Sequence, residues 1–305
     1  MKKIECFKIR LLTFDSESNI FEINKGKTLL DIKGITPYKK NPSIILADPF
    51  LFVYNDSLFL FYEEKRLNTP GVIKMISTCD LYTWSSPITV LEEPFHLSFP
   101  WVFEENGTIY MLPETGSQKS VRLYKSTNND LSSFEFVKEL IKSPKDKIIT
   151  MGYGDSCIYK TESKYFLFTM LQYEDNINCL ELYISDKVDG NYTPHPLSPI
   201  IKSQKTGRNA GCLLLKNNKL YRFSQDCTKK YGDNVNISII HTLTSTNYQE
   251  ELIKENILPT EIDFYKKGGH QFNAVNFKGK WIVATDAKEY HYLLGQRILN
   301  RINKL

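Results

Sequence analysis

The sequence has no apolar run long enough to cross a bilayer, because charged or polar residues interrupt every hydrophobic stretch. Its N-terminus, MKKIECFKIRLLTF, carries charges inside each apolar run and has no small-residue cleavage site, so no secretory signal is predicted. Lysine and arginine form no dense block, and the net charge is only +4. Nothing therefore indicates binding to nucleic acid or to an anionic membrane, and we expect a cytoplasmic protein without a membrane span.

Motifs for cofactors and metals are also missing. The sequence contains no phosphate-binding P-loop, no Gly-x-Gly-x-x-Gly, no Gly-x-Ser-x-Gly elbow and no Asp-x-Asp pair for a nucleotide-sugar metal. Its six cysteines include no Cys-x-x-Cys pair, and its five histidines are scattered, so no zinc site is predicted. Most of the cysteines lie in strand-like segments, which favours buried free thiols over disulfides. We predict no metal ligands and no cofactor from these patterns.

One hairpin pattern recurs five times. Each copy has a short apolar strand, a polar turn and a second strand rich in aromatic residues. The copy at residues 99–112 is the clearest, because Asn106-Gly107 is the strongest short signal for a hairpin turn. The spacings between successive copies are 51, 56, 54 and 62 residues, and the copies begin at Asp48, Phe99, Asp155, Asn209 and Gln271.

Four strands repeating about every fifty residues are typical of a β-propeller blade. A third strand-like segment follows each of the first four hairpins, and a weaker fourth follows in most. One such unit cannot bury both faces, so successive units stack around an axis. We predict an all-β, five-bladed β-propeller forming one domain over residues 1–305, with residues 6–13 completing the fifth blade and residues 290–305 forming a short helical tail. The alternative is a β-sandwich with evenly spaced strands.

In a propeller the first strand of every blade lines the central channel, so residues at matching repeat positions converge in space. Asp48 and Asp155 begin two of these strands, while Arg208 and His270 directly precede the fourth and fifth. Two carboxylates, an arginine and a histidine around one mouth are typical of sites that bind sugars or run acid/base chemistry. For Asp48, an ordinary Asp-Pro turn is the structural alternative.

The second strands of the hairpins end in a further set of polar residues. Glu63, Glu114 and Asp226 lie there, with Gln225 beside the last of them. His96 enters the second hairpin within a mostly apolar segment, where a histidine needs a partner. We expect these side chains to reach the same channel mouth.

Nine short segments occur in the order and spacing of a known domain: ADPFLF, FYEE, EEPFHLSFPWVFEENGTIYMLPET, VRLY, HPLSPI, RNAGCLL, FSQDC, YGDNV and GGHQFN. Through them, residues 45–275 resemble the N-terminal β-propeller of the glucosamine inositolphosphorylceramide transferase family and its bacterial relatives. Some of these relatives accompany formyltransferase-like or surface-polysaccharide genes. In longer members a separate glycosyltransferase domain follows the propeller.

That family is similar to a wider group of five-bladed propellers that includes the family-43 and family-32 glycosidases. The similarity implies a carbohydrate-binding channel with acidic residues, and Asp48 and Asp155 match such positions. An acid at the start of the second blade is also usual in those glycosidases, whereas Phe99 stands there in this sequence. Analogy with related propellers also raises a channel calcium ion as an option, although no ligand motif in the sequence demands one.

Three hypotheses follow for function. The first is a cytoplasmic glycosyltransferase-type enzyme of bacterial surface-glycan biosynthesis that acts on a sugar or an activated sugar, with a glycan-assembly enzyme as a candidate partner. The second is an inverting glycoside hydrolase, which needs two carboxylates roughly 6.5–9.5 Å apart. The third is a non-catalytic glycan-binding module that works with a separate transferase.

The first hypothesis assigns roles to the candidate residues. Asp48 would act as the base or stabilise an oxocarbenium-like centre, and Glu114 or Asp155 would be the acid, with its pKa raised by burial. Arg208 would hold a phosphate or carboxylate of the donor or acceptor. The remaining predicted substrate-binding residues, several of them to hydrogen-bond sugar hydroxyls, are Glu63, His96, Gln225, Asp226 and His270.

Overall fold

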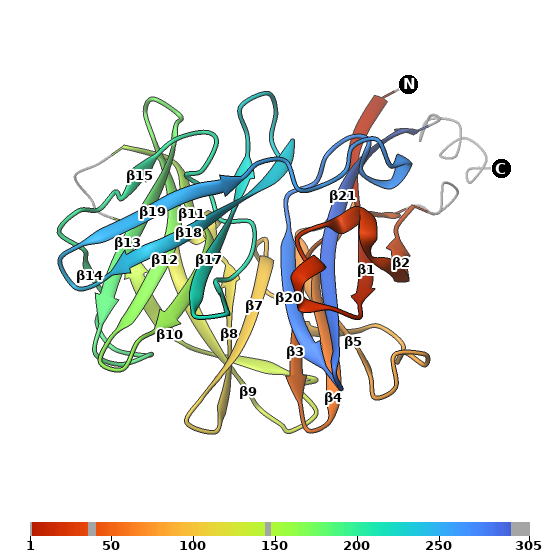
Figure 1. Cartoon of the computed structure of the whole chain (residues 1–305), viewed down its shortest axis with the longest axis horizontal. Coiled ribbons are helices and arrows are strands. Elements are labelled where there is room, and N and C mark those ends of the chain that lie inside the picture. Colours follow the sequence, from red (N-terminus) through yellow and green to blue (C-terminus); the bar gives the residue numbers. More distant parts are fainter. Residues whose placement is uncertain (1, 36–40, 144–147, 294–305) are drawn as a thin grey trace.

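The computed structural model describes residues 2–35, 41–143 and 148–293, whose strands form five antiparallel sheets (Figure 1). Four sheets follow the chain in order. The first has β3 (Ser43–Tyr54), β4 (Ser57–Arg66), β5 (Gly71–Thr78) and β6 (Ile88–Leu91). The second has β7 (Ser98–Glu105), β8 (Thr108–Glu114), β9 (Ser120–Ser126) and β10 (Phe134–Lys142). The third has β11 (Ile149–Lys160), β12 (Tyr165–Tyr173), β13 (Asn178–Ser185) and the two-residue strands β14 (Thr193–Pro194) and β15 (Ile201–Lys202). The fourth has β16 (Leu214–Lys216), β17 (Lys219–Asp226), β18 (Asn234–Leu243) and β19 (Tyr248–Lys254).

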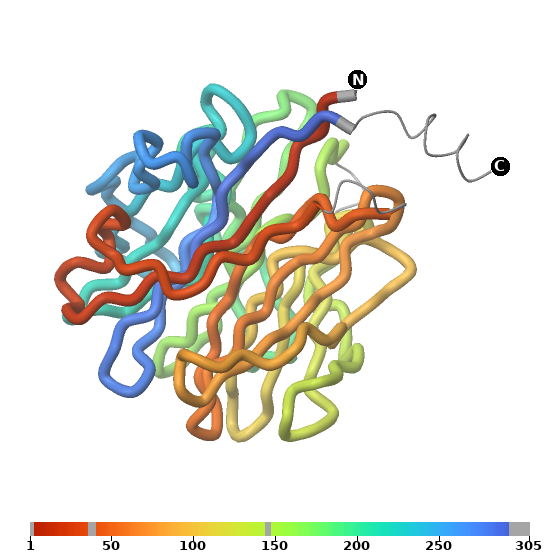
Figure 2. The backbone as a smooth tube through the Cα atoms, turned by 90° about the vertical axis from the view of Figure 1, so that its right-hand side faces the viewer, coloured from red at the N-terminus to blue at the C-terminus, as the bar shows by residue number. Residues whose placement is uncertain are grey.

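The fifth sheet joins the two ends of the described chain. Its strand order is β2-β1-β21-β20, from β1 (Lys2–Phe14), β2 (Lys27–Lys33), β20 (Phe272–Phe277) and β21 (Lys280–Leu293). Figure 2 shows β1 and β21 side by side, and their register runs from the Lys2–Leu293 pair to the Phe14–Trp281 pair. The N-terminal segment thus supplies two strands to this sheet, whereas the sequence pattern predicted one. The all-β, five-bladed propeller is confirmed.

The predicted helical tail is wrong for the part that the structure describes. Residues 290–293 continue β21 as extended chain, and residues 294–305 lie outside the described residues. The segment VATDAKEYHYL has β-branched residues at Val283 and Thr285 and tyrosines at Tyr290 and Tyr292, which suit a strand, and its pairing with β1 settles the local conformation. The helices of the described chain are four three-residue 3-10 turns: η1 (Glu17–Asn19), η2 (Ile23–Lys25), η3 (Gly116–Gln118) and η4 (Asp263–Tyr265). No described helix has the length and apolar content needed to cross a membrane.

Tight turns join the inner two strands of four blades. Both central residues of these turns have positive φ angles, as in the type I′ geometry that matches the twist of a hairpin; they are Asn55-Asp56, Asn106-Gly107, Asn217-Asn218 and Lys278-Gly279. The third hairpin instead uses a longer loop, closed by a hydrogen bond from Thr161 N to Lys164 O. The turn residues that marked the repeat in the sequence therefore have a direct conformational cause.

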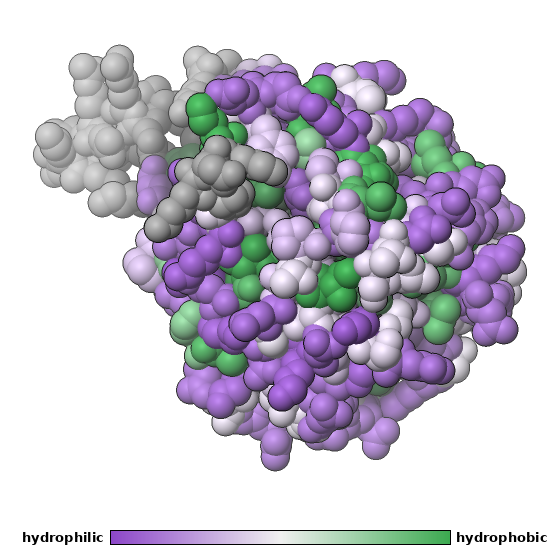
Figure 3. Space-filling view, turned by 90° about the vertical axis from the view of Figure 1, so that its left-hand side faces the viewer, coloured by the Kyte–Doolittle hydropathy of each residue, from purple (hydrophilic) through white to green (hydrophobic). Residues whose placement is uncertain are grey.

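The hydrophobic core lies between neighbouring sheets. One cluster packs Phe61 and Met75 of the first sheet against Met111 and Tyr124 of the second, and similar clusters fill the other interfaces. On the face drawn in Figure 3 the coloured surface is mostly hydrophilic, with apolar side chains in small separate groups. No two cysteines form a disulfide within the described chain. Stability thus comes from blade-on-blade burial.

Candidate active site

Three inner strands share a backbone distortion at the point where each meets the channel. Asp48, Phe99 and Asp155 have φ angles of 52°, 46° and 50°. At each place the pairing with the second strand shifts register, which marks a β-bulge. A bulge redirects side chains, and aspartate tolerates this left-handed conformation better than a bulky aromatic residue does. The equivalent repeat positions are therefore equivalent in backbone geometry.

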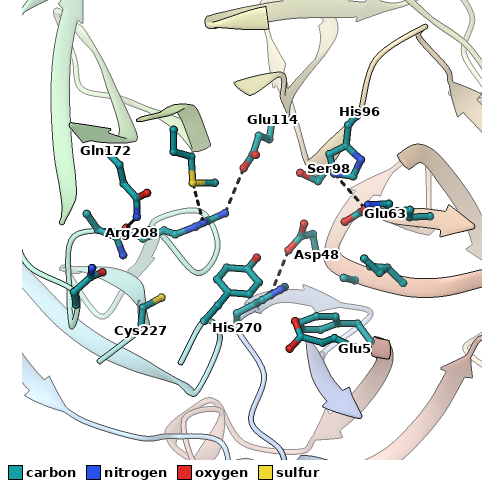
Figure 4. A pocket seen from close by; sticks show the side chains of 18 residues that line it. Glu5, Asp48, Glu63, His96, Ser98, Glu114, Gln172, Arg208, Cys227 and His270 are labelled. Carbon is teal, nitrogen blue, oxygen red and sulfur yellow. Dashed lines mark hydrogen bonds and ion pairs between the residues drawn. The ribbon is translucent and has the colours of Figure 1, made fainter. Parts of the chain in front are cut away.

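A cavity of about 590 Å³ opens at this end of the channel and receives residues from every blade (Figure 4). The described side chains that matter most for its chemistry are Asp48, Glu63, His96, Glu114, Arg208, Tyr231 and His270. The volume suits a small ligand of one or a few rings.

Asp48 is 6% exposed and faces the cavity. Its Oδ2 accepts a hydrogen bond from Phe99 N at 3.1 Å, and its Oδ1 lies 3.5 Å from His270 Nδ1. Burial raises the pKa of Asp48 to about 7, while the charge of His270 opposes this shift. The carboxyl group can therefore gain or lose a proton near neutral pH.

His270 is held by Asp286, a fully buried residue behind the cavity. Asp286 Oδ2 lies 2.8 Å from His270 Nδ1, and its Oδ1 accepts from His270 N at 2.7 Å. Burial disfavours the imidazolium, but the Asp286 carboxylate outweighs this and raises the pKa of His270; the same pairing outweighs burial and lowers the pKa of Asp286. Asp286 also accepts from Asp48 N at 3.2 Å, so it connects the fifth blade to the first.

On the other side of the cavity, Arg208 pairs with two acids. Its Nε donates to Asp155 Oδ2, and its Nη2 lies 3.5 Å from Glu114 Oε2. Asp155 Oδ2 also accepts from Gln225 Nε2 at 2.9 Å, so this oxygen has two donors. Burial and the nearby Asp155 raise the pKa of Glu114 to about 8, although Arg208 opposes this. Glu114 therefore carries a proton at neutral pH.

A third acid, Glu63, lies beside His96. Glu63 is 4% exposed, and its Oε1 has no hydrogen bond within the described chain, with His96 Nε2 3.4 Å away. His96 Nδ1 accepts from Gly71 N at 2.9 Å, so Nε2 carries the ring proton when the ring is neutral. Burial raises the pKa of Glu63 well above its usual value and lowers the pKa of His96 to about 4, with Lys65 adding to the latter. His96 is therefore neutral at pH 7, and burial favours the protonated form of Glu63.

The structure brings most of the predicted site residues together. Six of them line the cavity: Asp48, Glu63, His96, Glu114, Arg208 and His270. Asp155 and Gln225 lie directly behind Arg208 and contact each other. Asp226 is not among the cavity-lining residues. Its Oδ1 accepts from both N and Oγ1 of Thr228, so it caps its own turn instead of facing a ligand.

Sequence reasoning missed Asp286 and Tyr231. Asp286 directly follows the part of β21 that pairs with β20, a place close to that of Glu63 and Glu114 in their own hairpins, so the repeat pattern contained the signal. Tyr231 lies in the loop between β17 and β18, outside the strands that the repeat pattern marked.

Asp48, His270 and Asp286 also form the one described group of side chains whose spacing suits a metal ion, with ligand atoms within 4.8 Å of one another. A nitrogen with two carboxylates fits a transition metal better than calcium, which prefers oxygen ligands. Because the raised pKa of His270 favours an imidazolium between the two carboxylates, the group balances its charge internally. Its fit to calcium is therefore poor.

Five blades around a channel, with buried acids, an arginine and a histidine at one mouth, define a five-bladed β-propeller with an acidic channel site. Residues 34–287 match the family described as "Glucosamine inositolphosphorylceramide transferase 1, N-terminal", and the chain belongs to this family. The resemblance expected from the sequence motifs is thereby confirmed.

Relatives from two plants give the scale of the similarity. The chain is 34% identical over 242 residues to glucosamine inositolphosphorylceramide transferase 1 of Arabidopsis thaliana, covering 77% of this chain and 30% of that protein. The protein of the same name from Oryza sativa subsp. japonica is 33% identical over 262 residues, covering 80% of this chain and 33% of that protein. The chain thus spans about a third of the length of these relatives.

Two solved structures have a similar fold. A family 117 glycoside hydrolase from the marine bacterium Zobellia galactanivorans superposes with a TM-score of 0.58 at 12% identity, covering 99% of this chain and 98% of that one. The GH43 protein BlXynB from Bacillus licheniformis superposes with a TM-score of 0.52 at 14% identity, covering 70% of this chain and 43% of that one. At such low identity these comparisons show the shared fold.

Proposed function

We propose that this chain is a carbohydrate-active enzyme that transfers a sugar at the mouth of its channel, in the assembly of a bacterial surface glycan. The observation that carries the proposal is the pairing of Asp48 and Glu114. Asp48 is buried, the Glu114 side chain is 12% exposed, and both face one cavity, with the pKa of Asp48 raised to about 7 and that of Glu114 to about 8. One pair therefore supplies a base and an acid at the same pH.

The two groups suit different roles. Phe99 N and His270 stabilise the anionic form of Asp48, so this residue accepts the proton of an acceptor hydroxyl. Glu114 gives its proton to the oxygen of the departing group as the bond from the sugar carbon to that oxygen breaks. A new bond forms between the same carbon and the acceptor oxygen. Solvent then returns the proton from Asp48 to Glu114, which completes the balance.

Asp155 is the weaker candidate for the acid. Its carboxylate accepts from Arg208 and Gln225, so its role in the proposal is to hold Arg208 in place. Arg208 in turn presents its remaining guanidinium nitrogens toward Glu114 and the cavity. A phosphate or carboxylate of the substrate would share this arginine with Asp155.

The names of the relatives support sugar transfer as the reaction, since they are called glucosamine inositolphosphorylceramide transferases. Because the chain covers about a third of their length, transferase activity is assigned to it here only as part of the proposal. Water as the acceptor would give glycoside hydrolysis with the same two carboxyl groups. The cytoplasmic location and the absence of a cofactor stay predictions from the sequence, with a channel calcium ion as the option that analogy with related propellers raises.

A glycan-binding module without turnover is the second candidate, and one observation favours it. Phe99, fully buried, has the backbone position that Asp48 and Asp155 have in their blades. With Asp155 engaged by Arg208, the three bulge positions leave only Asp48 as an available acid. A binding module would work beside a separate transferase.

Product analysis tests the proposal directly. The parent, Asp48→Asn and Glu114→Gln proteins are incubated with nucleotide-sugars, phosphosugars and oligosaccharides, and products are identified by mass spectrometry. We expect the parent to form a transfer product and both variants to lose most of that activity. Thermal stabilisation by the same compounds reports binding separately. Stabilisation by glycans without any product in the parent would reject the enzyme and favour the binding module.

A further inference from the structure

An aromatic ring in the loop between β17 and β18 lies open at the channel mouth. Tyr231 lines the cavity and is 42% exposed, although every acid described there is largely buried. A large aromatic ring that is exposed to solvent lacks the stabilisation that burial of its apolar surface would give. A ligand that binds in the cavity and covers the ring would supply that burial.

Three side chains fix the position of this ring. The guanidinium carbon of Arg208 lies 5.0 Å from the ring centroid, Lys288 Nζ lies 5.2 Å away, and the His270 ring centroid lies 5.1 Å away. Cations within about 6 Å of an aromatic centroid are attracted to the ring's negative face. The ring is thus held in place by the residues that pair with Asp155, Glu114 and Asp286.

The backbone of the loop is fixed independently of the ring. Lys288 Nζ donates to the carbonyl oxygen of Tyr231, and Lys230 Nζ donates to Lys267 O at 3.0 Å. Gly232 follows with a φ of 58°, and a Cβ atom there would lie 3.0 Å from His270 Cδ2. These contacts use main-chain atoms or neighbouring residues, so they survive truncation of the Tyr231 side chain.

We propose that Tyr231 is the platform on which a pyranose ring of the substrate stacks, with its apolar C–H face against the tyrosine. The inference rests on the proposed carbohydrate site and names a specificity-determining residue within it. A pyranose ring presents a face of C–H groups, whose positive polarity suits the negative face of an aromatic ring. Its hydroxyl groups then point around the rim, toward Glu114 and the His270–Asp48 pair that share the cavity.

Stacking on Tyr231 would fix the orientation of the bound sugar ring, which the acidic residues alone do not define. Carboxyl groups can hydrogen-bond hydroxyls of almost any sugar, whereas a flat ring accepts only sugars with an unobstructed C–H face. Sugars with an axial hydroxyl on that face would be disfavoured.

Saturation-transfer NMR with simple glycosides tests the platform. The probes are methyl β-glucopyranoside, methyl β-galactopyranoside, methyl α-mannopyranoside and the methyl glycoside of N-acetylglucosamine. With the parent and with Tyr231→Phe, we expect saturation to be strongest at the protons of one ring face. Tyr231→Ala should lose that pattern and bind at least about tenfold more weakly, which corresponds to about 1.4 kcal/mol.

Tyr82→Ala is the matched control, because Tyr82 is 87% exposed and is not among the cavity-lining residues. It should bind like the parent, and both alanine variants should keep the parent melting temperature within a few degrees. Equal binding by the parent and Tyr231→Ala would overturn the platform. A loss in Tyr231→Phe as large as in Tyr231→Ala would also overturn it, since the hydroxyl group and not the ring would then matter.

The test separates this inference from the proposed function. Parent binding that Tyr231→Ala leaves unchanged rejects the platform alone. Binding that depends on Tyr231, together with no product from any sugar donor, rejects the transfer reaction alone. A parent that binds none of the probes rejects the platform together with the glycan site on which it rests.

Discussion

Asp48 and Asp155 have nearly the same backbone conformation, with φ angles of 52° and 50°, and each begins the channel-facing part of an inner strand. Their partners differ. Asp155 accepts from a guanidinium and a side-chain amide, whereas Asp48 accepts from one main-chain N–H and lies 3.5 Å from a histidine. The same repeat position therefore gives an ion pair with Arg208 in one blade and, in another, a carboxyl group whose pKa burial raises to about 7. Position in a propeller determines where a side chain lies, and its neighbours determine its chemistry.

The largest difference should appear in turnover. Asp48→Asn keeps the size and hydrogen bonding of the side chain but removes the base, so we expect a loss of about 10²–10⁴-fold in the rate of sugar transfer. Steady-state kinetics with the donor found by product analysis measures this. Asp155→Asn, the matched change, should lower the rate less. Equal losses would mean that the two aspartates share one role.

The free energy of unfolding should respond in the opposite order, with the larger loss on substitution of Asp155. Asp155→Ala leaves Arg208, whose side chain is 7% exposed, without its closest partner, and removing one member of a buried pair costs about 3–5 kcal/mol. Urea unfolding should therefore show a much lower midpoint for Asp155→Ala than for Asp48→Ala. If Asp48→Ala is the less stable variant, the assignment of the fixed pair to Asp155 is incorrect.

The pH dependence of stability provides a third comparison. Asp48 and Glu114 have raised pKa values of about 7 and about 8 in the folded protein, so between about pH 4 and pH 8 the folded state binds more protons than the unfolded state. The stability that these groups contribute is complete below about pH 4 and is lost as the pH rises through 7 and 8. Each group contributes a slope of up to about 1.4 kcal/mol per pH unit.

Denaturant unfolding across this pH range measures that slope. Asp48→Asn should reduce the decrease in the free energy of unfolding between about pH 4 and pH 7. Glu114→Gln should reduce it between about pH 4 and pH 8. Asp56→Asn, in an exposed hairpin turn where asparagine fits the positive φ, is the control and should leave the curve unchanged. A curve that keeps its slope in Asp48→Asn would contradict the raised pKa.

The smallest effect concerns the second partner of Asp155. Gln225→Leu removes one hydrogen bond to that carboxylate and one to Asn209 O, so we expect a loss of about 1–2 kcal/mol in the free energy of unfolding. Turnover should change by only a few-fold, because Arg208 still holds Asp155. A loss as large as that of Asp155→Ala would show that the glutamine, and not the arginine, fixes the acid.

The sequence was sufficient to predict the five hairpins, because type I′ turns need residues such as Asn-Gly and strands need alternating apolar residues. It was also sufficient to bring Asp48, Glu114 and His270 to one mouth, since repeat position alone determines that. It misjudged Asp226, because nothing in the sequence shows that Thr228 would donate to its carboxylate. Partners that are far apart in sequence, such as Arg208 with Asp155, decide which acids are held in ion pairs, and no local pattern reveals them.

The joint between β1 and β21 sets an order for folding. Four of the blades are each built from neighbouring residues, whereas the fifth pairs Leu12 with Val283. At ribosomal rates of roughly 5–20 residues per second, β1 waits on the order of tens of seconds for its partner to be made. Through that interval β20 and β21 are missing beside the first blade, so Leu46 and Leu51 lack Phe277 and Ile282, which share their buried cluster in the folded protein. Pairing of β21 with β1 therefore closes the ring of blades and completes the channel mouth in one step. Ligand binding at that mouth becomes possible only after this last step of folding.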